Sequence, residues 1–198
     1  MNGKTLCGEQ SYFEWFRPPL VPFLMCVQSF VGFNIAEYLF ILLSTLILVT
    51  SLYLTAKKWD VDYRLFLVIA LVTPYALTFS VLEGTEAMAL SMILLAAYFW
   101  PSSYSGIFFG LSFLTRYTSI LFFPLVLFLE RPNLKQLILT GVLFLLTVSP
   151  WLAYNYLEKG DPFYSPYGSY KFNVQARTGH YQSLDLMNFL VPGAFYSL

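Results

Sequence analysis

Long apolar runs separated by short polar segments constrain this chain more than any other feature of its sequence. Hydrophobic residues make up 58% of its 198 residues and charged residues only 11%, a composition outside the usual range of soluble domains. A bilayer core admits only helices or closed barrels, because each backbone polar group must be paired within the protein. We therefore predict an all-α fold: one domain that forms a polytopic transmembrane helical bundle.

The apolar runs also predict the order of the segments. Leu20–Phe33 is short for a crossing and contains Pro22, so we predict an interfacial helix there. Helices inside the membrane are predicted at residues 36–56, 64–82, 85–100 and 134–154. The predicted division is an external and interfacial segment at 1–35, a transmembrane bundle at 36–155, a tyrosine-rich external loop at 156–185, and the start of a further span at 186–198.

The run from Ser105 to Glu130 is as long as one crossing, yet it contains Arg116 and Pro124. A charge and a proline are both unfavourable inside a single lipid-facing helix. One interpretation is a tilted helix whose arginine faces a neighbouring helix. The interpretation that we favour is a split pair of half-crossings, at 106–115 and 119–129, which enter from one face and return to it. Arg116 would then lie near the turn, in a polar cavity.

Basic residues in short loops predict the orientation. Lys57, Lys58 and Arg64 occupy one short loop, and Arg131 and Lys135 occupy another. An excess of lysine and arginine marks the cytoplasmic side, and both loops lie inside only if the chain crosses an even number of times between them. A non-crossing hairpin at 105–130 meets this condition. Tryptophans fall at predicted span ends, as an interfacial aromatic belt predicts: Trp59, Trp100 and Trp151.

With this orientation, one outer face collects the residues that could carry chemistry: Arg17, Glu83, Glu86, Arg116, Lys171, Arg177 and His180. Arginine suits a lipid phosphate because its planar fork donates two parallel hydrogen bonds. The acids beside it suit a general base or a metal. The alternatives are ordinary: an arginine that snorkels to head groups, acids that begin a helix, and solvated loop residues.

The composition limits cofactors and partners. Net charge is zero, which gives no indication of nucleic-acid binding. Cys7 and Cys26 have no metal-like spacing, and Cys26 is interpreted as a small apolar residue in its helix. No set of metal ligands is predicted. The sequence does not identify a cofactor and leaves a divalent metal open, and the lipid bilayer is the first predicted partner, in a multi-pass protein of the cell membrane.

Four short motifs follow one another in a set order. They are a basic-Pro-Pro element at 17–20, a loop whose acidic residue Glu86 opens a helix at 78–86, a glycine-rich half-helix ending in Thr-Arg at 110–117, and a helix end leading into an external loop at 150–155 and 160–163. Together they resemble the C-type glycosyltransferase superfamily, whose members take sugars from polyprenyl- or dolichyl-phosphate. The nearest likeness is to the protein O-mannosyltransferase and aminoarabinose transferase type.

This resemblance implies roles for the residues. Arg17 and Arg177 would hold the phosphate of the lipid-linked sugar, Arg116 would line the same cavity, and Glu86 would match the acidic residue of the second external loop. It also implies a catalytic aspartate in a first external loop, after a first transmembrane helix. Both are missing, because Glu9 and Glu14 lie too close to Arg17. The expectation is a transferase piece truncated at both ends, active only if a complementary chain supplies the base.

Two other functions compete with this interpretation. The missing aspartate favours a non-catalytic membrane subunit or a lipid-phosphate-binding scaffold. A small transporter is the third hypothesis, but such folds are often built from inverted repeats, and no internal repeat is visible in the sequence.

Overall fold

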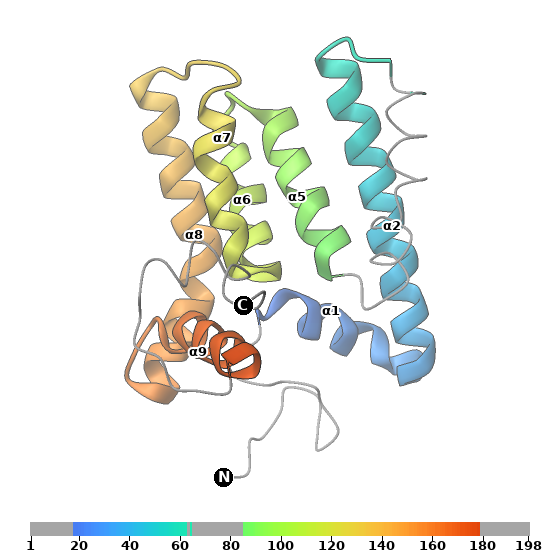
Figure 1. Cartoon of the computed structure of the whole chain (residues 1–198), viewed down its shortest axis with the longest axis vertical. Helices are drawn as coiled ribbons and strands as arrows, with labels where there is room; N and C mark the ends of the chain where they lie inside the picture. The colour runs from blue at the N-terminus through green and yellow to red at the C-terminus, as the bar shows by residue number, and fades with distance from the viewer. Residues whose placement is uncertain (1–17, 63, 65–84, 179–198) are drawn as a thin grey trace.

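A computed structural model describes residues 18–62, 64 and 85–178 (Figure 1). Within these ranges every regular element is helical, which confirms the all-α prediction. The elements are α1 (Leu20–Gln28), η1 (Ser29–Val31), α2 (Phe33–Lys58), α5 (Thr85–Phe99), α6 (Ser105–Thr115), η2 (Tyr117–Phe122), α7 (Phe123–Leu127), α8 (Leu134–Lys159) and α9 (Tyr164–Thr178). The helix predicted at 64–82, apart from Arg64, and the run at 186–198 lie outside the described residues.

Among the residues that the structure describes, two helices are long and apolar enough to cross a membrane: Tyr38–Lys58 within α2, and α8. A core helix of a soluble protein would be mostly buried, whereas only 17% of the most apolar window of α8 is buried. Large apolar side chains instead cover its outer surface, including Leu134, Ile138, Leu145 and Leu146. Such an unbroken apolar face is suited to lipid tails.

Helices α2, α5, α6 and α8 pack side by side in that order (Figure 1), with α5 between α2 and α6, and α6 against α8. Five of the seven buried residues of α5 are alanine or serine, and the other two are methionines, so its neighbours can approach closely at the small residues. Hydroxyl groups bridge the helices. Thr55 Oγ1 donates to the Leu94 carbonyl oxygen at 3.2 Å, and Ser112 Oγ donates to the Ala89 carbonyl oxygen at 3.2 Å.

The contact between α6 and α8 depends on two glycines. A Cβ atom added to Gly106 would lie 2.1 Å from the Thr140 carbonyl oxygen, and one added to Gly110 would lie 2.6 Å from Thr147 Cβ. Their spacing places both on one face of α6, and backbones in membranes approach most closely at such small-residue pairs. Gly141 on α8, in contrast, has no atom within 4 Å of an added Cβ.

Helix α1 lies across the end of the bundle instead of along it (Figure 1), consistent with the predicted interfacial helix. Val21 packs with Phe40 and Met88, which belong to α2 and α5. One sequence interpretation was wrong here, because Cys26 is disulfide-bonded and is not merely a small apolar residue. The other cysteine of the chain is Cys7, and disulfides persist on the oxidising side of a membrane.

Helix α8 shows how the sequence begins, interrupts and ends a helix. Asn133 and Gln136 form a reciprocal capping box at its start. Pro150 lacks the N–H that would bond to the Leu146 carbonyl oxygen, and Ser149 Oγ donates to that oxygen instead, at 3.1 Å. Gly160 ends the helix in the left-handed conformation. Asp161 Oδ1 then accepts the Phe163 N–H at 2.8 Å, and α9 follows within the segment predicted as a loop.

We predict that Gly106→Ala destabilises the bundle by about 1–3 kcal/mol, since the new methyl group would force α6 away from the α8 backbone. Gly110→Ala should also destabilise the bundle, because the new methyl group would meet Thr147 Cβ, which no rotamer change can move away. Gly141→Ala is the matched control and should be neutral or slightly stabilising. Thermal unfolding of the three variants in detergent tests this, and an unchanged midpoint for Gly106→Ala would contradict the close contact.

Candidate functional site

The split pair predicted at 105–130 is present as a hairpin. Helix α6 ends at Thr115, Arg116 is extended with φ −154° and ψ 115°, and η2 and α7 form the second limb. The two limbs pack together through Phe109 and Phe123, whose ring centroids are 5.0 Å apart. Pro124 is no obstacle because it lies at the start of α7, where its missing N–H is not needed.

The second limb returns to the end of the bundle from which the first limb starts. Trp100 Nε1, just after α5, donates to the Glu130 carbonyl oxygen at 2.8 Å. Lys58 Nζ, at the end of α2, lies 3.1 Å from Glu130 Oε1 and also donates to the Trp100 carbonyl oxygen. We name Lys58, Trp100 and Glu130 the basal clasp. It joins the loops after α2 and α7, so both predicted basic loops lie at one end.

At the opposite end, Arg116 meets Glu86. Arg116 Nη1 donates to Glu86 Oε1, and the two side chains form an ion pair. Glu86 belongs to the first turn of α5, where the positive end of the helix dipole favours a carboxylate. Its other oxygen, Oε2, accepts a hydrogen bond from Thr85 Oγ1 at 2.8 Å. The acid predicted from its position at a helix start is therefore the one that contacts the arginine at the turn of the hairpin.

The ion pair borders an apolar cluster and is open to a ligand. Leu114, Val148 and Trp151 are buried together, with Leu20 of α1 packed against them. In contrast, 47% of the Arg116 side chain and 37% of the Glu86 side chain are exposed. Guanidinium carries five N–H donors in a planar fork. Because Glu86 contacts one terminal nitrogen, the fork retains donors for an incoming anion.

One family model matches most of the chain. The model of glycosyltransferase family 87 matches residues 15–184. The chain belongs to this family. Family 87 is a C-type family of membrane glycosyltransferases, which confirms the resemblance at the level of the superfamily and the predicted transferase class. No curated protein and no solved structure matches the chain.

In this family 87 chain, only some of the other predicted site residues belong to the described part of the structure. Arg17, Glu83 and His180 lie outside the described residues. Arg177 lies within the backbone of α9, and Lys171 is an exposed residue of the same helix. In Figure 1, α9 and α1 both lie at the end of the bundle opposite the α7–α8 loop. No group of three metal-ligating side chains occurs among the described residues.

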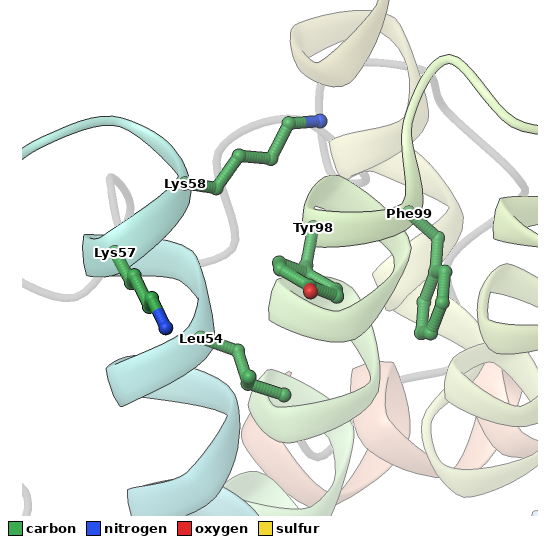
Figure 2. A pocket seen from close by; sticks show the side chains of 5 residues that line it. All are labelled: Leu54, Lys57, Lys58, Tyr98 and Phe99. Atoms are coloured by element: carbon green, nitrogen blue, oxygen red, sulfur yellow. The ribbon is translucent and has the colours of Figure 1, made fainter.

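The pocket in Figure 2 lies between the last turns of α2 and α5 and measures about 510 Å³. Its lining combines Leu54, Tyr98 and Phe99 with two lysines, Lys57 and Lys58. Lys58 belongs to the basal clasp, so the pocket is at the end opposite Arg116 and includes none of the predicted site residues.

Sequence reasoning missed several hydrogen-bonded side chains beside Arg116. Trp151 Nε1 donates to the hydroxyl oxygen of Tyr117 at 3.1 Å. Ser165 Oγ donates to Asn155 Oδ1 at 2.8 Å, and neither residue has any exposed surface. Asn155 gave one available signal, because helix periodicity places this polar residue on the same face of α8 as the buried Val148 and Trp151. Its pairing with Ser165 is not visible in the sequence.

We predict that residues on the two sides of the hairpin label from opposite faces of the membrane. Single cysteines would replace Lys57, Thr118, Arg131 or Asp161, all exposed, in a background without Cys7 and Cys26. A membrane-impermeant maleimide should reach positions 57 and 131 from one side, and 118 and 161 from the other. Labelling of 57 and 131 from different sides would mean that residues 105–130 cross the membrane once.

Proposed function

We propose that this family 87 protein transfers a sugar from a polyprenyl- or dolichyl-phosphate donor to an acceptor on the outer face of the cell membrane, as a multi-pass protein. Arg116 binds the phosphate, and Glu86 is the carboxylate beside the reaction. The Arg116–Glu86 ion pair at the turn of an intramembrane hairpin is the observation that carries the proposal. Membership of family 87 supplies the reaction class.

The position of Arg116 fits a lipid-linked phosphate. A guanidinium at the turn of a half-crossing can meet a head group while the polyprenyl chain stays in the bilayer. Its remaining N–H donors form charge-assisted hydrogen bonds with phosphate oxygens, and these are stronger than bonds between neutral groups. Positive charge near the leaving oxygen also stabilises the charge that develops as the sugar–phosphate bond breaks.

Glu86 has two tasks in this proposal. Its carboxylate holds the guanidinium by one nitrogen, and it is the acid that faces the same turn. As the acceptor hydroxyl attacks the anomeric carbon, the bond from that carbon to the phosphate oxygen breaks. The proton of that hydroxyl passes to a carboxylate. We assign this role to Glu86, whose carboxylate is paired with Arg116. Arg17 and Arg177 are proposed as further phosphate ligands, while Lys171, Glu83 and His180 are weaker candidates for the site.

Two observations from different parts of the chain support an outward-facing site. Lys57, Lys58 and Arg131 gather at the basal-clasp end, and an excess of basic residues marks the cytoplasmic side. The disulfide-bonded Cys26 lies on α1 at the other end (Figure 1), and a disulfide is typical of the oxidising side. Both support the proposal that the Arg116–Glu86 pair faces the extracytoplasmic side.

The test is sugar transfer from a polyprenyl-phosphate donor in membranes that contain the full-length protein and its native partner chains. Arg116→Gln should lower kcat by about 10²–10³-fold, in the range of losing one transition-state donor. Glu86→Gln should lower kcat by about 10²-fold or more if it takes the proton. Arg131→Gln and Glu158→Gln are exposed charge controls and should leave the rate unchanged.

The outcomes separate the hypotheses. Full activity of Arg116→Gln would contradict the proposed site. Saturable donor binding without turnover by the wild type, even with partner chains present, would identify a non-catalytic lipid-phosphate-binding subunit instead. A Glu86→Gln variant that recovers its rate at high donor concentration would show that Glu86 only orients Arg116.

A further inference from the structure

A chain of buried side chains connects the Arg116 turn to α9. It consists of Trp151 and Asn155 on α8, Tyr117 on η2, and Ser165 on α9. Tyr117 is bonded to Trp151 and also to Ser165. Asn155 Nδ2 extends the chain to the Pro162 carbonyl oxygen, at 3.3 Å. Three separate segments therefore meet in one hydrogen-bond network.

The donors and acceptors of these groups fix the direction of the network. Indole N–H can only donate, so the Tyr117 hydroxyl oxygen accepts from Trp151. The single hydrogen of Ser165 goes to Asn155 Oδ1, so Ser165 Oγ accepts the hydroxyl hydrogen of Tyr117. The Asn155 amide donates to Pro162 and accepts from Ser165. Each residue thus donates a hydrogen bond to the next one in the series. Removing any one of them therefore weakens the other hydrogen bonds of the network.

The network lies next to Arg116 in the chain and can fix the orientation of its side chain. Tyr117 directly follows Arg116, and its ring also packs against Phe113 of α6, with centroids 5.1 Å apart. The only backbone link between α6 and η2 is the extended Arg116 residue. A helix interrupted in this way has freedom to rotate about that residue. Fixing the Tyr117 hydroxyl to α8 and α9 removes this freedom and holds the guanidinium toward Glu86.

We propose that the Tyr117–Ser165–Asn155 network docks α9 onto the hairpin and positions Arg116 for the donor phosphate. Tyr117, Ser165 and Asn155 are positioning residues, because they act through Arg116 and not on the substrate. The proposal rests on the proposed function for its kinetic consequence only. Its structural consequence is a coupling between α9 and residues 114–120, which are separated in the chain by more than forty residues.

The structural arm of the test is amide hydrogen exchange of the full-length protein in lipid nanodiscs. Ser165→Ala removes one oxygen on α9 and should raise exchange at residues 114–120 about fivefold, the effect of losing one buried hydrogen bond. Tyr117→Phe should raise exchange in α9 to a similar extent. Tyr156→Phe and Tyr167→Phe remove exposed hydroxyls on α8 and α9 and should change neither segment.

The kinetic arm measures the donor KM of the same variants. Ser165→Ala and Tyr117→Phe should each raise the donor KM about fivefold with kcat nearly unchanged, and the double variant should be no worse than either single one. Increased exchange with an unchanged KM would overturn the positioning role. Unchanged exchange in both segments would overturn the network itself. Absence of transfer by the wild type would contradict the proposed function, while the exchange data would still decide the network.

Discussion

An arginine at the end of an apolar half-helix is favourable only with an anion beside it, and in this protein the carboxylate of Glu86 is that anion. The rest of the arrangement follows from that pairing. Helix α6 stops at Thr115 so that Arg116 can face the start of α5, and the chain then turns back as η2 and α7. A continuous helix would carry the guanidinium past the first turn of α5. The chain breaks at Arg116, eight residues before Pro124, so the proline is not the cause of the break.

The two ends of the bundle are built differently. At the basal clasp, Lys58 contacts the side chain of Glu130 and the backbone of Trp100, whose own indole N–H bonds to the Glu130 backbone. These contacts close that end around a tryptophan with 1% of its surface exposed. At the other end, the Arg116–Glu86 pair is well exposed. A rigid scaffold that holds an accessible charged group is the arrangement that binding and catalysis need.

Much of this could be predicted from local sequence. The charge of Arg116 and the position of Pro124 predicted a split pair, and the loop lysines and arginines predicted that it returns to the same face. Glu86 was recognisable as an acid at a helix start. What could not be predicted depends on tertiary contacts. Trp100 directly follows α5, but Trp151 lies well inside α8 and not at its end. Both are buried, and both bond to the hairpin. Likewise, α9 was assigned to a loop because it lacks an apolar run, yet Ser165 and Asn155 dock it.

The Arg116–Glu86 pair also explains how the charge of Arg116 is balanced before a donor binds. A guanidinium beside apolar helices is more favourable with an anion next to it, and Glu86 is that anion in the structure. Glu86 neutralises it through one nitrogen, and the side chains remain open to solvent. A donor phosphate can then approach the free side of the fork without first breaking a buried salt bridge. In the mechanism that we propose, the bonds of Tyr117 to α8 and α9 keep the guanidinium in place during this exchange, so that it can bind the phosphate.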